Sequence, residues 1–227
     1  RTSSSAASDV YKRQDEDFLI FNKPSNYAVH SGTKNDHGLI DILRAVLKDN
    51  SLNLCHRLDK GTSGCLVIAK NQKFLGFFNN QLKQRKVKKI YHAIVKDFIS
   101  EEMVIEDSID TNTKGSFNKV SINKNGKEAK SILKPLKKLD CSSLIEIEIL
   151  TGRTHQIRAQ CEKINKNIAN DKKYGCKDFN TRLKHSGIKR LGLHSSEISF
   201  LDLDNKRNTF VADYDDQFEK MVSYLNT

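Results

Sequence analysis

The chain alternates between short apolar runs and segments in which apolar residues repeat with a helical period. The runs have the length and composition of buried strands, and the clearest are residues 18–21, 65–69 and 90–95. Helical repeats of apolar residues are found in residues 38–48, in residues 72–84 and around residues 218–225. No internal repeat is visible, and this mixture of strands and helices indicates an α+β fold.

Apolar stripes define two of the helices. Between residues 38 and 48 the stripe consists of Leu39, Ile42, Leu43, Val46 and Leu47. Asn71 can cap the next helix, which we expect to reach about Gln84. Its stripe is Phe74, Phe77, Phe78 and Leu82. Aromatic residues at helical spacing usually belong to a core, so we interpret this stripe as core and not as a platform for stacking bases.

The second half of the chain is expected to be richer in strands. Residues 103–139 have a β-rich pattern, with Asn125-Gly126 as the signal for a hairpin turn. In residues 145–149 three isoleucines alternate with two glutamates, so one face of that strand should contact water. Further strands are expected near residues 197–201 and 208–212.

Of two segments that lie between these strands, one is expected to form a helix and the other a loop. Thr154 can open a helix, whose apolar residues would be Ile157, Cys161 and Ile164. Residues 176–190 are polar and basic, and we expect a loop there. The C-terminal helix is expected to carry Phe218, Met221, Val222 and Leu225.

Length and composition are those of a soluble globular protein. The chain has 227 residues, of which 37% are hydrophobic and 30% charged, and no apolar run approaches the length of a membrane span. Its five cysteines show no Cys-x-x-Cys spacing, and no Cys and His set has the spacing of a zinc site. We therefore expect a reduced, cytoplasmic protein without a metal.

The net charge of +11 favours a polyanionic partner, and nucleic acid is the most plausible one. The charge is concentrated in the middle of the chain. Lys83–Lys96 contains six basic residues and no acidic one, whereas acids outnumber bases from Glu197 onward. A charge that serves only solubility is the alternative interpretation.

The richest chemistry lies in the nine residues His56–Gly64, which we expect to form a loop. They precede the apolar run of residues 65–69, and Gly61 and Gly64 permit the tight turns that such a loop needs. Polar side chains at the point where a loop meets a rigid element often serve binding or catalysis. On local sequence alone, the favoured interpretation is that Asp59 is an ordinary turn residue that bonds its own backbone.

Several motifs in the same order support the functional interpretation. They are His56-Arg57-Leu58-Asp59 with Thr62-Ser63-Gly64, Asn22-Lys23-Pro24 with Val29-His30, Lys89-Ile90-Tyr91, Gly152–Arg158, Asp171 with Tyr174-Gly175, and Leu193-His194. Together they resemble the RluA family of pseudouridine synthases over about residues 16–225. Within that family, residues 171–192 most resemble the RluC-like branch, which acts on large-subunit (23S) ribosomal RNA.

The resemblance implies the pseudouridine synthase catalytic fold, a bent and mostly antiparallel mixed sheet flanked by helices, with the active site in a central cleft. It also implies an isomerase that converts uridine to pseudouridine within RNA and needs no cofactor. We expect a monomer without a metal. Residues 15–227 would be the catalytic domain. Residues 1–14 do not match the family and look like a linker or adaptor. We expect the small N-terminal RNA-binding domain that many members carry to be missing, by truncation or by nature.

The resemblance assigns three catalytic residues. Asp59 aligns with the essential aspartate, which adds to an electrophilic carbon or takes a proton during bond cleavage. Arg158 aligns with the arginine that pairs with this aspartate, and a guanidinium fits a carboxylate with two bonds. Tyr91 aligns with the active-site tyrosine, whose ring can stack on the uracil and whose hydroxyl can assist removal of the C5 proton.

Further residues are expected to contact the RNA. Arg57 resembles the residue that helps displace the target base from its helix. The other expected contacts are His56, Thr62, Lys86, Lys88, Lys89, Arg153 and Ile157. We interpret His56, His155 and His194 as structural histidines, because this chemistry requires none.

The chain departs from the family pattern at Ala159-Gln160, where a histidine usually follows the small residue. We expect altered support around the site and retained activity. Three alternative functions remain open: a non-catalytic RNA-binding or ribosome-assembly protein, a pseudouridine synthase of the same family that acts on transfer RNA, and a carboxylate-based nucleoside hydrolase. The hydrolase would need a second acid at a defined separation, and the motifs supply only one.

Overall fold

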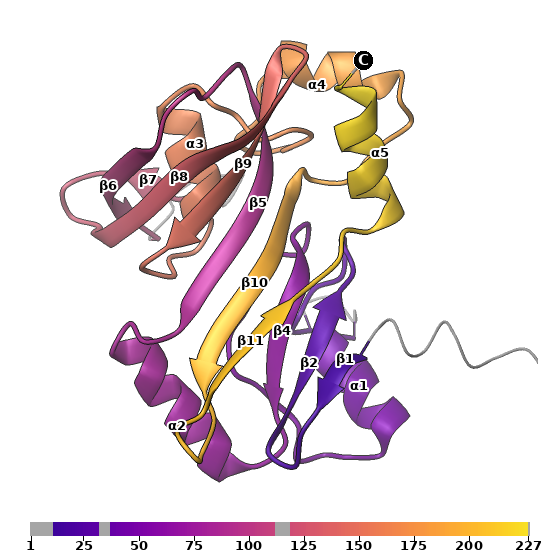
Figure 1. The fold of residues 1–227 in the computed structure, drawn as a ribbon, viewed down its shortest axis with the longest axis vertical. Coiled ribbons are helices and arrows are strands. Elements are labelled where there is room, and N and C mark those ends of the chain that lie inside the picture. Colours follow the sequence, from indigo (N-terminus) through magenta and orange to yellow (C-terminus); the bar gives the residue numbers. More distant parts are fainter. Residues whose placement is uncertain (1–10, 32–36, 112–118, 227) are drawn as a thin grey trace, which may run out of the picture. The chain divides into compact units, whose positions relative to one another are not determined.

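The computed structural model describes residues 11–31, 37–111 and 119–226, and it divides the chain into two compact units. The first unit comprises the described residues up to Lys88 together with Ser195–Asp213. The second comprises those from Lys89 to His194 and from Tyr214 onward. Each unit combines a sheet with helices, so the predicted α+β class is confirmed (Figure 1).

The sheet of the first unit has the order β1-β2-β4-β10, with β3 paired to β4 and β11 paired to β10. Its strands are β1 (Tyr11–Gln14), β2 (Phe18–Lys23), β3 (Asn53–Leu54), β4 (Ser63–Ala69), β10 (Leu193–Leu201) and β11 (Arg207–Val211). β2 runs antiparallel to β4, with Ile20 opposite Val67. Every residue of β4 is buried, which explains its uninterrupted apolar sequence.

Two helices complete the first unit. α1 is Leu39–Leu47, and α2 is Gln72–Lys83. Asn71 caps α2 as predicted, because its side-chain oxygen accepts a hydrogen bond from the backbone N–H of Phe74 at 2.9 Å. Phe74 and Phe78 have no exposed surface and pack with Phe18 and Phe200, so these two residues of the stripe belong to the core as predicted. Phe77 is half-buried and lies outside this core cluster.

The sheet of the second unit has the order β5-β9-β8-β6-β7, and its pairings are antiparallel. Its strands are β5 (Lys88–Lys96), β6 (Met103–Asp110), β7 (Ser121–Ile122), β8 (Lys127–Leu139) and β9 (Ser142–Ile149). The isoleucines of β9 are buried and its two glutamates are half-buried, as the alternation predicted.

Three helices belong to the second unit: α3 (Gln156–Lys163), α4 (Lys177–Lys184) and α5 (Asp216–Tyr224). α4 and α5 share a core with β5, to which they contribute Phe179, Leu183, Phe218 and Met221. α3 packs near β6 and contributes Ala159 to a second, smaller cluster around Tyr174.

Four predictions about these elements were wrong in part. Residues 176–190 are not a loop throughout, because α4 lies within them. α3 begins at Gln156 and not at Thr154, because His155 adopts a left-handed conformation with φ 54° and forms the N-cap. Asn125-Gly126 lies in a turn, but the strands that flank it, β7 and β8, both pair with β6 and lie on opposite sides of it.

The apolar stripe predicted for α1 was also wrong in part. Leu39 and Leu43 are buried, but Ile42 is 40% exposed and Val46 is 67% exposed, whereas Ile40 is buried in their place. The buried face of α1 is therefore rotated from the predicted stripe. The strand β1 lies within the segment that sequence analysis left out of the fold, and it pairs with β2. The origin of residues 1–14 stays a prediction.

Candidate functional site

The loop that carries Asp59 connects β3 to β4 in the first unit. Leu58 and Thr62 are buried, Asp59 is half-buried and Arg57 is exposed. The carbonyl oxygen of Asp59 accepts a hydrogen bond from the N–H of Thr62 at 3.0 Å, which closes a tight turn. The buried Leu58 and Thr62 anchor a turn that leaves Asp59 and Arg57 accessible. Thr62, which the sequence predicted to contact RNA, is therefore buried at one end of this turn.

Side chains from the β2 end hold the backbone of this loop. Lys23 is fully buried, and its ammonium donates to the carbonyl oxygens of Pro24 at 2.9 Å, Tyr27 at 2.8 Å and Lys60 at 3.2 Å. Ser25 donates its hydroxyl to the carbonyl oxygen of Gly61 at 2.8 Å. A buried cation must be satisfied by hydrogen bonds, and here one of them fixes the residue directly after Asp59.

His56 and Gly64 fix the two ends of the loop. The Nε2 atom of His56 accepts a hydrogen bond from the N–H of Val67 at 3.1 Å, and the ring stacks on Phe78. Nε2 is therefore unprotonated in this contact. Gly64 has φ 106°, and a Cβ atom there would lie 2.1 Å from the carbonyl oxygen of Ser195. Only glycine fits such a position without displacement of the backbone.

Tyr91 and Arg158 belong to the second unit. Tyr91 lies on β5 opposite Ile147 of β9 and is 7% exposed. Arg158 lies on α3, one residue after the buried Ile157. Asp59 lies in the first unit, so the predicted pairing of Arg158 with Asp59 and the approach of Tyr91 to both stay predictions.

Arg158 is held by a carboxylate that sequence analysis did not identify as its partner. Its Nε atom donates to Oδ2 of Asp171 at 2.7 Å, and its Nη2 atom donates to Oδ1 at 2.9 Å. The Asp171 side chain has no exposed surface. Burial alone would raise the pKa of Asp171, but the bonds and charge of Arg158 and two backbone N–H groups outweigh it and lower that pKa.

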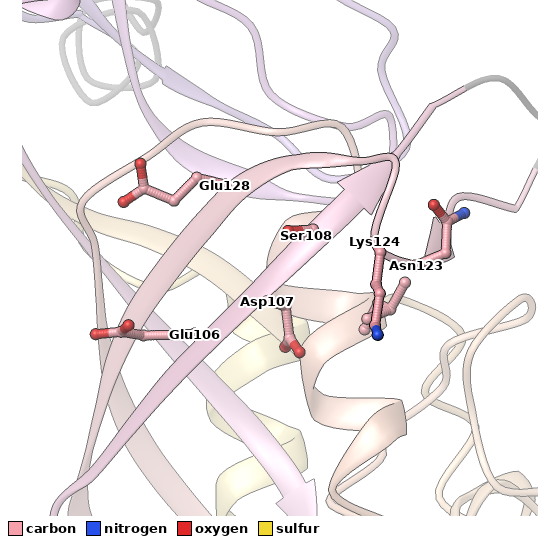
Figure 2. A pocket seen from close by; sticks show the side chains of 7 residues that line it. Glu106, Asp107, Ser108, Asn123, Lys124 and Glu128 are labelled. Atoms are coloured by element: carbon pink, nitrogen blue, oxygen red, sulfur yellow. The ribbon is translucent and has the colours of Figure 1, made fainter.

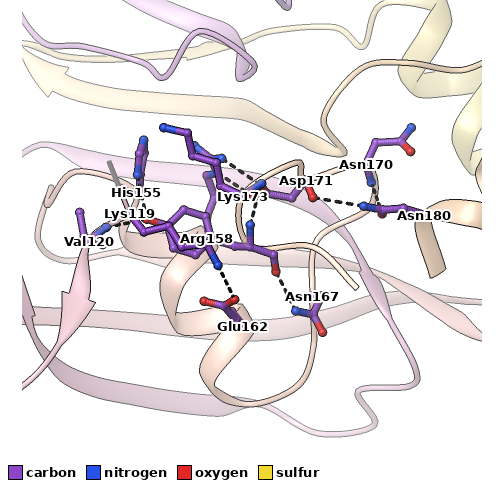
Figure 3. A network of polar contacts seen from close by, with 11 residues as sticks. Lys119, Val120, His155, Arg158, Glu162, Asn167, Asn170, Asp171, Lys173 and Asn180 are labelled. Atoms are coloured by element: carbon purple, nitrogen blue, oxygen red, sulfur yellow. Dashed lines mark hydrogen bonds and ion pairs between the residues drawn. The ribbon is translucent and has the colours of Figure 1, made fainter. Parts of the chain in front are cut away.

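Asp171 also organises the segment that follows it, as Figure 3 shows. Its Oδ1 atom accepts from the N–H groups of Lys173 at 2.8 Å and Tyr174 at 3.0 Å. A Cβ atom on Gly175 would lie 2.1 Å from the carbonyl oxygen of Asp171. The motif of Asp171 with Tyr174-Gly175 is therefore a tight turn built around the carboxylate that orients Arg158.

Tyr174 forms a second support for Arg158. The guanidinium lies 5.0 Å from the centre of the buried Tyr174 ring, within the range of a cation–π contact. The hydroxyl of Tyr174 accepts from the N–H of Val120 at 2.8 Å and lies 2.9 Å from Nδ1 of His155. Arg158 is thus fixed in position by Asp171 on one side and by an aromatic ring on another.

Two glutamines attach the arginine motif to β8. The Nε2 atom of Gln156 donates to the carbonyl oxygen of Lys130 at 3.1 Å and to the hydroxyl of Ser131 at 2.9 Å. Gln160, which stands in place of the usual histidine, accepts from the hydroxyl of Ser131 at 2.8 Å and donates to the carbonyl oxygen of Ala129 at 3.1 Å. Its buried amide is therefore satisfied and supports α3 without a charge.

The expected RNA-contacting lysines have different surroundings. Lys86 is exposed, whereas the Nζ atom of Lys88 lies 3.4 Å from Oε1 of Glu197. Lys89 is half-buried, and burial, followed by the charge of Arg153, lowers its pKa to about 8. Arg153 donates its Nε–H to the carbonyl oxygen of Glu128 at 2.9 Å. Lys89 and Arg153 thus place two cations near one another in the second unit.

A pocket of about 450 Å³ at the β6–β8 edge of the second unit has a different character (Figure 2). Its lining residues are Glu106, Asp107, Ser108, Ile122, Asn123, Lys124 and Glu128. Two of its three carboxylates have lysine partners outside the lining, Glu106 with Lys130 and Asp107 with Lys163. The lining itself contributes only one cation, Lys124, so it offers little attraction to phosphate groups.

Among the described residues, no group of three or more His, Cys, Asp or Glu side chains is placed to hold a metal ion. No helix within the described ranges is long and apolar enough to cross a membrane.

Comparison with known proteins identifies relatives over most of the chain. Residues 17–163 match the family described as RNA pseudouridylate synthase. The chain is 37% identical over 203 residues to "Ribosomal large subunit pseudouridine synthase C" of Buchnera aphidicola subsp. Baizongia pistaciae, covering 88% of this chain and 64% of that protein. It is 35% identical to the protein of that name from Haemophilus influenzae, covering 93% of this chain and 67% of the relative.

Solved structures with the same fold include two human proteins. "Human RNA Pseudouridylate Synthase Domain Containing 4" matches with a TM-score of 0.78 at 24% identity, over 97% of this chain and 94% of that one. "Human RNA Pseudouridylate Synthase Domain Containing 1" matches with a TM-score of 0.76 at 24% identity, over 94% and 86%. These structures confirm the fold that the motifs implied.

Proposed function

The chain belongs to the RNA pseudouridylate synthase family, and from that premise we propose that it isomerises uridine to pseudouridine within RNA. The observation that carries the proposal is the loop of Asp59. Its backbone is held by Lys23 at Lys60 and by Ser25 at Gly61, directly after an accessible carboxylate. A carboxylate on a fixed loop is what a reaction at one carbon of a bound nucleotide requires.

The proposed reaction exchanges one bond to C1′ for another. The N1–C1′ bond breaks, the uracil turns, C5 bonds to C1′, and the proton lost from C5 is balanced by one gained at N1. Asp59 either adds to an electrophilic carbon or takes a proton. Arg158 would keep Asp59 ionised, and its own orientation is already set by Asp171 and Tyr174. No oxidant or imported group is needed.

The remaining assignments follow the family motifs. Tyr91 would stack on the uracil and assist removal of the C5 proton, and Arg57 would help to displace the target base from its helix. Its exposure on the Asp59 loop suits that role. Arg153, Lys89 and Lys86 would contact the RNA backbone, and Lys88 would have to exchange Glu197 for a phosphate. Ile157 is buried, so it would shape the pocket for the base through packing.

We propose large-subunit ribosomal RNA as the substrate, because the relatives with 33–37% identity are named for it. The chain spans 64% of the length of the Buchnera relative, so the activity of the whole relative is part of the proposal. We further propose that residues 15–227 form the catalytic domain and that the protein works in the cytoplasm as a monomer without metal or cofactor.

Mapping of pseudouridine tests the function directly. The protein is incubated with large-subunit ribosomal RNA or with transfer RNA, and pseudouridine is located by carbodiimide modification. We expect isomerisation in the ribosomal RNA, unchanged in the presence of a chelator. Release of free uracil would indicate a hydrolase, and binding without modification would indicate an RNA-binding protein.

Asp59→Asn is the matched variant for this test. The substitution keeps the size of the side chain and removes its charge, so we expect the loss of pseudouridine formation with RNA binding and thermal stability retained. Wild-type turnover by the Asp59→Asn variant would show that Asp59 does not carry the chemistry.

A further inference from the structure

The basic surface around α4 carries more positive than negative charge. Residues 172–189 contain six Lys and Arg residues and one acid, Asp178. Four of these cations, Lys172, Lys177, Lys184 and Lys189, are exposed and have no ion-pair partner among the described residues. Some other lysines of the unit do have a carboxylate partner, such as Lys134 with Glu102 at 3.4 Å.

The lysines near α4 differ from two lysines of β8 that have carboxylate partners. Lys130 is paired with Glu106 and Lys134 with Glu102, which reduces the positive field at these two positions. Lys177 and Lys184 lie on α4, a short helix whose Phe179 and Leu183 are buried in the core, and Lys172 and Lys189 lie on either side of that helix in the sequence. Such a surface favours a polyanion.

A pocket of about 400 Å³ lies beside these cations, between α4, α5 and the turn before β9. The residues in its lining include Tyr224, which is 40% exposed, together with His185 and Arg182. The Tyr224 hydroxyl donates to the carbonyl oxygen of Arg182 at 3.3 Å, which positions the ring next to α4. The carboxylate of Asp140 also lines the pocket.

We propose that this pocket binds the base of an unpaired nucleotide of the RNA, while the exposed Lys177, Lys184 and Lys189 bind the neighbouring phosphates. Tyrosine, histidine and arginine are the side chains on which unstacked bases lie, and they accept any base. Asp140 can accept a hydrogen bond from the amino group of a base. It would repel the carboxylates of an acidic peptide, which is why RNA fits this combination better.

The proposal rests on the proposed function in that RNA is the substrate, and it adds a binding site whose lining contains none of the residues assigned to the reaction. Arg182 is not a free cation in this site. Its guanidinium contacts the thiol of Cys141 and is attracted by Asp140, which together raise its pKa. The Arg182 guanidinium can stack on a base while it keeps these two partners, whereas binding a phosphate would require it to leave them.

The phosphate part of the proposal is tested with two matched triple variants. One replaces Lys177, Lys184 and Lys189 with Gln, and the control replaces the paired Lys96, Lys130 and Lys134, so each lowers the net charge by three from +11 to +8. Binding of a short single-stranded oligoribonucleotide is titrated at several salt concentrations. We expect the first triple to flatten the slope of log affinity against log salt by about 2, at roughly 0.7 per phosphate contact, and the control by much less. Equal slopes would overturn the proposal.

The base part is tested with Tyr224→Leu, with Phe98→Leu as the control because Phe98 is 45% exposed on the same unit. We expect Tyr224→Leu to weaken single-strand binding about tenfold, Tyr224→Phe to restore it, and binding of the same RNA as a duplex to change little. Equal effects of Tyr224→Leu and Phe98→Leu would overturn the proposal. Thermal unfolding establishes that each variant is folded.

Two competitors exclude other ligands. Displacement of the RNA by AMP at a comparable concentration would indicate a site for free nucleotides. Displacement of the RNA by polyglutamate, to the same extent in the wild type and in Tyr224→Leu, would indicate a surface that binds anions in general. Either result overturns the proposal. Pseudouridine formation by the wild-type protein is measured separately, so absence of isomerisation with the expected binding results would refute the proposed function and leave this site standing.

Discussion

At Arg158 a single guanidinium combines two contacts to one carboxylate with a cation–π contact to Tyr174. The motif predicted that Arg158 matters, but its partner Asp171 follows thirteen positions later in a separate motif. Spacing along a chain does not reveal a contact formed between a helix and a later turn. The sequence therefore identified Asp171 and Tyr174 as members of a pattern without indicating that they orient the arginine.

Arg158→Lys should not be conservative. A lysine ammonium is a point charge and cannot reproduce the two parallel bonds to Asp171 or lie flat on the Tyr174 ring. We expect the single-turnover rate of isomerisation to fall by orders of magnitude at saturating RNA, with a smaller effect on RNA affinity. An unchanged single-turnover rate would remove Arg158 from the reaction.

Asp171→Asn should destabilise the protein and change its response to acid. The pKa of Asp171 is below its ordinary value of 3.8, so its contribution to folding is present above that pH and is lost as the pH falls through the folded pKa. Without the carboxylate, Arg158 is a nearly buried cation without its counter-ion, which should cost roughly 3 kcal/mol at pH 7. Urea unfolding at several pH values measures this.

The difference between wild type and Asp171→Asn should shrink as the pH is lowered below about 4, because the wild-type carboxyl then becomes protonated. Asp178→Asn on the exposed side of α4 is the control and should have little effect at any pH. A difference that stays constant with pH would mean that the ion pair is not the source of the stability.

At the scale of helices and strands, the sequence correctly predicted the elements whose apolar residues repeat with a clear period. α2 was predicted with its cap and core because four apolar residues and Asn71 point to the same helix. α4 was missed because it has only two buried apolar residues, Phe179 and Leu183, among charged neighbours. The buried face predicted for α1 was wrong in part because a stripe of apolar residues does not show which of them the rest of the unit covers.

The conformation at Gly64 should matter for the whole first unit. Gly64→Ala introduces a Cβ atom 2.1 Å from the carbonyl oxygen of Ser195, in a residue with φ 106°. We expect the free energy of unfolding to fall by roughly 2–4 kcal/mol, because backbone must move. Gly76→Ala is the control. It lies in α2 with no atom within 4 Å of the new Cβ, so it should stabilise by about 0.5–1 kcal/mol. Equal effects in denaturant unfolding would contradict this account.

At the scale of the whole molecule, the net charge of +11 predicted a polyanionic partner but not where the partner binds. The structure shows why a count of lysines is insufficient. Of three neighbouring lysines in the sequence, Lys86 is exposed, Lys88 is paired with Glu197, and Lys89 is half-buried with a pKa lowered to about 8. Their contributions to RNA binding should therefore differ in size and in pH dependence.

Lys89 should make RNA affinity depend on pH. Because its pKa lies near 8, the ammonium that would contact a phosphate is largely present at pH 7 and largely absent at pH 9. We expect the wild-type affinity for RNA to fall several-fold between these values, and Lys89→Gln to bind more weakly at pH 7 with little further change. Lys86→Gln removes an exposed charge and should keep the pH dependence of the wild type.

Folding stability should change in the opposite direction at Lys89. The folded pKa is below the ordinary value of 10.5, so burial of the cation opposes folding below about pH 8, and this cost disappears as the pH rises toward 10.5. Lys89→Gln should remove that rise in stability. Affinity titrations and urea unfolding over the same pH range separate the two effects.

A wild-type affinity that is independent of pH from 7 to 9 would show that Lys89 does not contact the RNA as a cation. In that case the two cations at Lys89 and Arg153 would not form a phosphate site.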